Sequence, residues 1–424
     1  MKTSIQSVKG TREFYPEDMA IHQWLYGKIR EVSELFGYQE YDGPFLEKIE
    51  LYAAKSGEEL VKEQSFVFPD RNNELITLRP ELTPSLARMI AQKQGELVFP
   101  ARWWSFGPFW RYERPQKGRT REFFQWNIDQ IGANSPEADA EMIGICAAFL
   151  KSVGLSPAEV IILVNDRQLM DQEIAAMGIA EEKRKGVSKL IDRKDKLRPI
   201  EWDQAVLDEG FSADQLSYLK DLLNNKDLWQ KSSSMTRMFE VLKLMGAADY
   251  VRYDPNIVRG LDYYTGVVFE AWDAGAEGRA VLGGGHYDNL VGDVGGNPLP
   301  GVGFAMGDVM ISLVLEKYGK LPEVNLYDSA ILVTVFDDSL RDVSMELASE
   351  IRSSSVRCIC YSDPGKLQKQ LKYADRLGMA AALVIGPDEA QEGNVTIKDL
   401  KNHTQKTVRR TQVQAELQQI LARS

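Results

Sequence analysis

Apolar residues recur at helical spacing shortly after an opening segment that reads as a loop. That loop carries Lys9–Arg12 and Tyr15–Asp18. From about Met19 to Phe36 the apolar residues follow a period of 3.6, which predicts an amphipathic helix. Gly37 suits the end of this helix, because glycine readily adopts the left-handed conformation that closes many helices.

Short strand-like runs and a helix come next, before two longer runs. The segments predicted between residues 38 and 131 are a strand at Tyr38–Phe45 broken by Pro44, a hairpin of Phe66–Phe68 with Leu75–Leu78, a helix at Pro80–Ile90, and strands at Ala101–Tyr112 and Thr120–Ile131. A charged loop, Glu113–Arg119, joins the last two strands. We expect these two strands to pair.

The pattern changes after a predicted helix at Pro136–Val153 and a strand at Val160–Val164. From about 166 to 246 it is almost wholly helical and polar, which predicts an inserted helical module. Strands resume at Val251 and Thr265. The predicted elements after them are a glycine turn within Val281–Asp288, a strand at Gly301–Gly307 and an apolar helix at Val309–Tyr318.

The last hundred residues follow a linker at Leu321–Asn325 and alternate between strand-like and helix-like runs. Their order is Ala330–Val335, Val343–Ser353, Val356–Tyr361, Lys366–Leu377 and Ala380–Ile385. This β, α, β, α, β alternation is typical of a parallel or mixed sheet with helices on it. We therefore predict a domain at 1–325 and a second at 326–424.

Composition narrows the classes of protein. At 424 residues the chain exceeds one compact core. Its formal charge of −11 argues against binding nucleic acid by overall attraction, although a local basic groove is compatible with it. No apolar run approaches the roughly 20 residues of a membrane span, and the N-terminus lacks a signal core. Three cysteines and three histidines favour reduced thiols in the cytoplasm and no metal site.

Two groups of polar residues carry candidate chemistry. Arg259, Tyr263 and Tyr264 stand together before a strand, and arginine offers a fork of donors to carboxylate or phosphate oxygens. A surface ion pair and two core tyrosines would give the same pattern. In the paired strands, alternation places Phe123, Gln125 and Asp129 on one face, which could bind a planar ring and an ammonium group. A solvated hairpin is the plainer alternative.

These motifs resemble those of the histidyl-tRNA synthetases, a family of class II aminoacyl-tRNA synthetases, over nearly the whole chain. Trp110–Arg119 through Gln125 is similar to the second motif of the class, and Arg259–Tyr264 to a histidine-specific motif. Leu282–Asp288 resembles a second histidine motif, with His286 where the family usually has arginine. Further matches lie at Gly10–Phe14, Leu78–Thr83 and the C-terminal module.

The resemblance implies roles in forming histidyl-adenylate from L-histidine and ATP. Glu81, Thr83 and Gln125 would bind the α-amino group, and Asp129 and Tyr264, with Tyr263, would surround the imidazole. The catalytic residues would be Arg111, which bridges the histidine carboxylate and the α-phosphate, and Arg259, which stabilises charge on that phosphate. Phe123 would stack on adenine, with Glu113 near its amino edge.

The resemblance also implies partners and a fold. Arg114, Gln116, Lys117 and Arg119 would approach the acceptor end of tRNA(His), and the C-terminal module would read its anticodon. Mg²⁺ is expected with the ATP phosphates, with no dedicated metal ligands in the protein. The implied fold is α/β: an antiparallel class II sheet flanked by helices, a helical insertion and a C-terminal α/β anticodon-binding domain. A cytoplasmic homodimer is expected.

One position departs from the class. Its third motif normally ends in Gly-x-x-Arg, whose arginine contacts adenine and the γ-phosphate, but Met310 stands there in Gly307–Met310. A thioether can cover a purine but cannot bind phosphate. Another cation could serve, ATP could bind more weakly, or the chain could have left catalysis. The alternatives are thus a catalytically silent histidine sensor, such as the regulatory subunit of ATP phosphoribosyltransferase, or an RNA-binding module without enzymatic activity.

Overall fold

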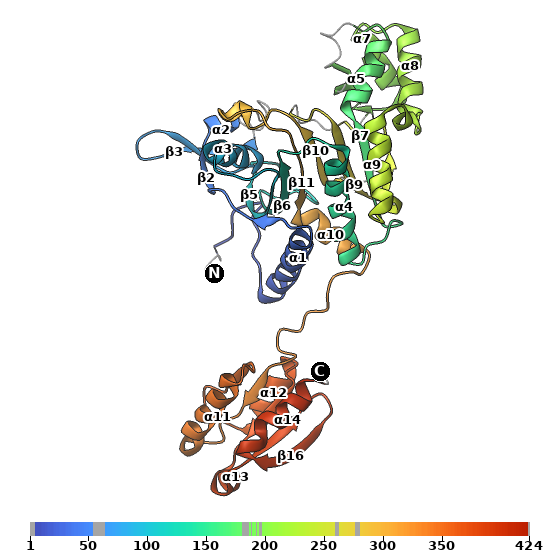
Figure 1. Cartoon of the computed structure of the whole chain (residues 1–424). Coiled ribbons are helices and arrows are strands. Elements are labelled where there is room, and N and C mark those ends of the chain that lie inside the picture. Colours follow the sequence, from blue (N-terminus) through green and yellow to red (C-terminus); the bar gives the residue numbers. More distant parts are fainter. Residues whose placement is uncertain are drawn as a thin grey trace. The chain divides into compact units, whose positions relative to one another are not determined.

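Figure 1 shows the chain as a computed structural model, which divides into two compact units: Met1–Glu13 with Gln23–Leu321, and Phe14–His22 with Pro322–Ser424. The structure describes residues 5–53, 64–179, 186–187, 189–191, 193–194, 197–258, 263–275 and 280–422. Each unit has its own apolar core. Among the described residues, no helix is long and apolar enough to cross a membrane.

The large unit is built on a sheet with the strand order β1-β5-β6-β11-β10-β9-β7-β8. These strands are β1 (Gln39–Glu40), β5 (Ala101–Trp110), β6 (Glu122–Ile131), β7 (Val160–Asp166), β8 (Val251–Tyr253), β9 (Val267–Asp273), β10 (Ala280–Tyr287) and β11 (Gly301–Gly307). Neighbouring strands are antiparallel except for β1 with β5 and β7 with β8. The predicted pairing of the two long strands is confirmed, with Phe123 opposite Phe109 and Asp129 opposite Trp103.

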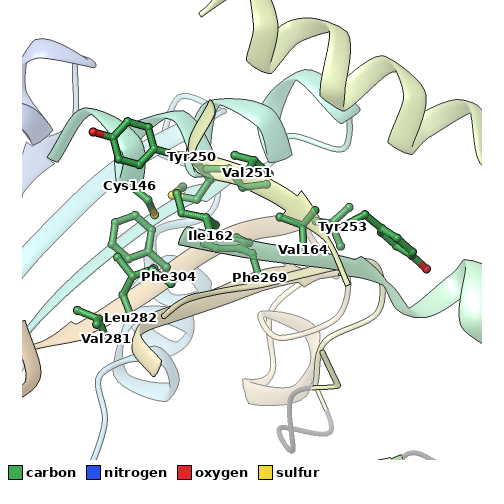
Figure 2. Close-up of a cluster of buried hydrophobic side chains, with 14 of the residues drawn as sticks. Cys146, Ile162, Val164, Tyr250, Val251, Tyr253, Phe269, Val281, Leu282 and Phe304 are labelled. Atoms are coloured by element: carbon green, nitrogen blue, oxygen red, sulfur yellow. The ribbon is translucent and has the colours of Figure 1, made fainter. Parts of the chain in front are cut away.

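One face of this sheet, the rear face, carries the main core. Trp126 and Ile128 of β6 and Phe304 of β11 pack there with helix α4 (Pro136–Ser152). Figure 2 shows another part of the same core, where Phe269 and Phe304 lie near Ile162 and Cys146. Because side chains alternate along a strand, the intervening residues of β6 lie on the opposite face, which we call the site face.

Three helices lie near the large sheet: α1, α3 and α10. The sequence prediction of the first helix was three residues late, because α1 (Pro16–Leu35) begins at a proline, which fits a helical first turn, followed by Glu17 and Asp18. Helix α3 (Thr83–Lys93) places Leu86 and Ile90 in a second cluster that includes Tyr264 and Tyr287. Helix α10 (Asp308–Lys317) follows β11 directly.

Two strand predictions were wrong. The run Tyr38–Phe45 pairs in the sheet only as β1, because Asp42 and Gly43 turn away to bind the Arg79 side chain. The glycines within Val281–Asp288 form no turn but lie inside β10. A β-carbon on Gly284 would overlap Gly303 O, so glycine lets neighbouring strands and Phe269 pack closely.

A small second sheet stands beside α3, and a helical segment follows β7. The small sheet has the order β2-β4-β3, with β2 (Leu46–Lys48), β3 (Phe66–Pro69) and β4 (Leu75–Leu78); α2 (Glu50–Ala53) follows β2. The helices described between β7 and β8 are α5 (Arg167–Ala176), α7 (Pro199–Asp208), α8 (Ala213–Asn224) and α9 (Ser233–Leu244). Asp166, Ser212 and Ser232 cap the starts of three of them with side-chain oxygens.

The small unit is a five-stranded mixed sheet with the order β13-β12-β14-β15-β16. The predicted alternation is confirmed as β12 (Ile331–Val333), α11 (Arg341–Ser353), β13 (Cys358–Cys360), α12 (Leu367–Arg376) and β14 (Ala381–Val384). The sequence pattern did not predict the remaining elements, which are α13 (Pro387–Glu392), β15 (Asn394–Asp399), β16 (Thr404–Arg409) and α14 (Val413–Leu421).

Candidate active site

On the site face, the residues contributed by β11 and β10 are very small. Gly303, Ala305 and Gly307 stand opposite Asp129, Asn127 and Gln125 of β6. On β10, Gly283 and Gly285 continue the same rows. On this face β10 and β11 therefore present almost no side chains, whereas the neighbouring β6 presents polar ones. We call its two ends the Asp129 end and the Phe123 end.

At the Asp129 end, a buried carboxylate meets a buried phenol. Tyr287 Oη donates to Asp129 Oδ1 at 2.8 Å, and both residues are at most 5% exposed. Burial raises the pKa of Asp129 to about 7, although the Tyr287 hydrogen bond acts in the opposite direction. A β-carbon on Gly303 would overlap Asp129 Oδ1, so the carboxylate occupies space that only glycine leaves open.

Three tyrosines lie next to one another at this end. The ring of Tyr263 lies 4.7 Å from that of Tyr264 and 6.2 Å from that of Tyr287, measured between centroids. Tyr264 is buried and lies over Gly285, where a β-carbon would be 2.7 Å from Tyr264 Cδ1. The structure thus places Tyr263 and Tyr264 beside Tyr287, the hydrogen-bond partner of Asp129. An aromatic enclosure with one carboxylate suits a small, flat, polar ligand.

At the Phe123 end, an arginine lies over an aromatic ring. The Arg111 guanidinium carbon is 5.4 Å from the Phe123 ring centroid, and Arg111 Nε donates to Pro80 O at 2.9 Å. The second contact fixes Arg111 beside the segment that carries Glu81, which is buried, and Thr83, the first residue of α3. Gln125 shares the face between Phe123 and Asp129. This end therefore combines a cation, a ring surface and polar groups within one part of the sheet.

The charged loop after β5 folds into a tight turn. Gln116 and Arg119 exchange backbone hydrogen bonds of 3.1 and 2.8 Å around Gly118, which has a φ of +78°. Arg119 forms an ion pair with Glu113 at 3.2 Å, whereas Arg114 and Lys117 are exposed to solvent. Glu113 is thus placed by the loop itself.

The predicted catalytic Arg259, with Gly260, Leu261 and Asp262, lies outside the described residues. The described part of that motif resumes at Tyr263.

His286 stands on the rear face, away from the candidate site. Its Nδ1 lies 2.9 Å from Asp139 Oδ1 of α4, and its Nε2 lies 3.4 Å from Asp288 Oδ1. Burial lowers the pKa of His286, but the hydrogen bond and negative charge of Asp139 outweigh it and raise that pKa above 6.5. His286, the residue that departs from the family motif, therefore links β10 to α4 on the rear face of the sheet.

Sequence reasoning assigned no role to Tyr287 and Gly303, the two residues that hold Asp129 in place. The alternation of Gly283, Gly285 and Tyr287 on one face was the available signal. The consecutive glycines of this segment predict a turn instead, and that prediction hid the alternation. No group of three histidine, cysteine, aspartate or glutamate side chains suited to a metal occurs in the part of the chain that the structure describes.

Comparison with known proteins identifies relatives along the full length. A family model for "Histidyl-tRNA synthetase" matches residues 10–308, and one for "Anticodon binding domain" matches residues 328–420. The histidine–tRNA ligase of Leptospira biflexa is 34% identical over 96% of this chain and 95% of its own, and that of Thermococcus kodakarensis is 34% identical over 98% and 99%. The crystal structure of histidyl-tRNA synthetase from Nostoc sp. PCC 7120 has the same fold, with a TM-score of 0.83, 24% identity, and coverage of 99% of this chain and 100% of that one.

Proposed function

The chain belongs to the histidyl-tRNA synthetase family, and we propose that it works as a histidine–tRNA ligase. Its site face would bind histidine at the Asp129 end and ATP at the Phe123 end. The observation that carries this division is the contrast between the two ends of β6. One end holds a buried carboxylate within tyrosines, and the other holds a cation over an aromatic ring.

Histidine binding follows from the groups at the Asp129 end. An imidazole has an N–H on one side and a second ring nitrogen on the other, so it can donate to Asp129 and accept from a tyrosine hydroxyl. Tyr287 already donates to Asp129 Oδ1, which leaves the second carboxylate oxygen as the acceptor for the ligand. We assign Tyr264, with Tyr263, to the ring, and Glu81, Thr83 and Gln125 to the α-amino group.

Adenylate formation needs the histidine carboxylate to attack the α-phosphorus of ATP as pyrophosphate leaves. We assign Arg111 to bridge the two reactants, because its guanidinium fork can hold a carboxylate and a phosphate at once. Arg259 would stabilise the charge that builds on the α-phosphate. Phe123 would stack on adenine and Glu113 would lie at its amino edge.

Mg²⁺ would enter with the triphosphate and neutralise part of its charge. This ion commonly keeps several waters and takes few protein ligands.

The transfer step assigns work to the loop and to the second unit. Exposed cations in a tight loop suit phosphate contacts, so we assign Arg114, Gln116, Lys117 and Arg119 to the acceptor end of tRNA(His). We assign residues 1–325 to catalysis, with the helical insertion at about 166–246, and residues 326–424 to the anticodon. The anticodon-binding match at 328–420 favours the ligase over the regulatory-subunit alternative. A cytoplasmic homodimer completes the proposal.

Histidine-dependent exchange of pyrophosphate into ATP tests the proposal, followed by charging of tRNA(His). Both activities are expected from the purified full-length chain. Intact histidine binding without exchange would reject the ligase and support a histidine sensor. RNA binding without histidine binding would support the RNA-binding module.

A further inference from the structure

Three segments that are distant in sequence meet beside the Phe123 end. They are the N-terminal loop around Arg12, the start of β6 and the first turn of α10. Asp308, the first residue of α10, joins them, because its Oδ2 accepts from Arg12 Nη2 at 2.8 Å and its Oδ1 accepts from the backbone N–H of Phe124 at 2.9 Å.

The Asp308 carboxylate accepts a backbone hydrogen bond from β6 just beyond the end of the β11–β6 ladder. The last ladder pair between β11 and β6 is Gly307 with Gln125, so the next would be Asp308 with Phe124. The backbone turns into α10 at this point, and the Asp308 side chain accepts the Phe124 N–H. Asp308 is 3% exposed, so its charge depends on Arg12 as a partner.

The N-terminal loop is fastened to the second motif by further contacts. Gly10 O accepts from Arg121 N at 2.8 Å, and Gly10 has a φ of +90° with Arg121 packed against it. On the other side, Met310 lies against Gly118, where a β-carbon would overlap Met310 Sδ. The charged loop is therefore held between the N-terminal loop and α10.

We propose that Arg12 and Asp308 are positioning residues for ATP binding, and this inference rests on the proposed function. Their ion pair fixes the position of α10 relative to Phe124 and the adjacent Phe123. Because Met310 lies on α10, the ion pair also fixes the position of Met310. Met310 supplies no charge, so the surface it offers to the nucleotide depends on being held in place. The ion pair thus supplies by geometry part of what an arginine at position 310 would supply by direct contact.

The proposal predicts an effect confined to one end of the site. Asp129 lies five residues from Phe124 along β6, or about 17 Å at the usual rise of a strand. Loss of the ion pair should therefore weaken the use of ATP and leave the use of histidine nearly unchanged. A general loss of folding would affect both.

The experiment measures KM for ATP and KM for histidine separately in the exchange reaction. Arg12→Ala and Asp308→Asn are each expected to raise KM for ATP by roughly tenfold, with KM for histidine within about twofold. Asp308→Asn keeps an acceptor for the Phe124 N–H, which protects folding, and Arg12→Lys should restore part of the loss. The double variant should be no worse than the worse single one, because both changes break one ion pair.

Lys317→Ala is the matched control. Lys317 pairs with Asp273 at 2.7 Å at the other end of the same helix, so its loss should change neither KM. Equal rises in the two KM values, additive effects of the two substitutions, or an unchanged KM for ATP would each overturn the inference. If the unaltered chain shows no exchange, the proposed function fails instead, and calorimetric binding of a non-hydrolysable ATP analogue to the same variants then decides the inference.

Discussion

The two ends of β6 differ in how they hold charge. At the Asp129 end the carboxylate is buried, has one phenol as its hydrogen-bond partner and has its pKa raised to about 7. At the Phe123 end the carboxylates have cationic partners, because the buried Asp308 pairs with Arg12 and Glu113 pairs with Arg119. The first end is shaped by packing and the second by electrostatics.

Under the proposed function, this difference would let one strand serve two ligands of opposite character. A small ring is best recognised by a close, water-poor enclosure, in which an unmet hydrogen bond is costly. A triphosphate needs cations that remain accessible until it arrives. The glycines of β10 and β11 allow the enclosure at one end only, because the tyrosines gather there.

The largest expected effect is at the Phe123 end. Arg111→Ala should lower the rate of histidine-dependent exchange by roughly 10²–10³-fold, because it removes a preorganised cation from the reacting phosphate. Steady-state exchange kinetics measures it. Arg114→Ala, in the exposed loop, is the control and should leave exchange nearly unchanged. A fall limited to histidine binding would mean that the two ends are not divided as proposed.

Glycine replacement on β11 should separate the two ends by stability. Gly303→Ala would place a methyl group onto Asp129 Oδ1 and 2.7 Å from Ile128 O, and should cost about 3 kcal/mol in unfolding free energy. Gly307→Ala, on the same strand, meets nothing within 4 Å and should cost far less. Urea unfolding of both variants measures the contrast. Similar losses for the two would show that the strand, and not the Asp129 end, is intolerant.

The raised pKa of Asp129 predicts a stability that depends on pH. The folded protein keeps the carboxyl protonated up to about pH 7, whereas the unfolded chain ionises it near pH 4, so its burial destabilises the fold progressively between these values. Asp129→Asn removes this effect. The variant should gain on the order of 2 kcal/mol over the parent at pH 8 and almost nothing at pH 4.

Unfolding midpoints measured from pH 4 to pH 8 test this expectation, and the same variant should bind histidine more weakly. A stability difference that does not change with pH would contradict a raised pKa for Asp129. Asp249→Asn, on the 3₁₀ turn Ala248–Tyr250 before β8, is a suitable control for loss of one carboxylate.

The smallest effect is expected behind the sheet. The pKa of His286 is raised above 6.5 in the folded chain, so its ion pair with Asp139 stabilises fully below pH 6.5 and is lost as pH rises through the raised value. His286→Gln should therefore cost more unfolding free energy at pH 6 than at pH 9. His403→Gln, at an exposed position of the small unit, is the control for loss of one imidazole. A change of more than about twofold in histidine affinity would place His286 in the site after all.

Local sequence patterns were enough to predict the order of most elements and to nominate the residues of the candidate site. Alternation along Thr120–Ile131 was enough to place Phe123, Gln125 and Asp129 on one face, because a strand has a period of two wherever it lies. The resemblance of its motifs was enough to suggest the family, which the comparisons then showed. These are local properties, which chain neighbours largely decide.

Which distant residues meet could be seen only in the folded chain. Arg12 and Asp308 are 296 positions apart, and Tyr287 and Asp129 are 158 apart. It also showed that the glycine run is a strand and that His286 faces α4. Glycine is compatible with both turns and close packing, so its role depends on the atoms across from it. For the same reason the raised pKa of Asp129 could not be read from its neighbours in sequence, since it comes from burial by β10, β11 and the tyrosines.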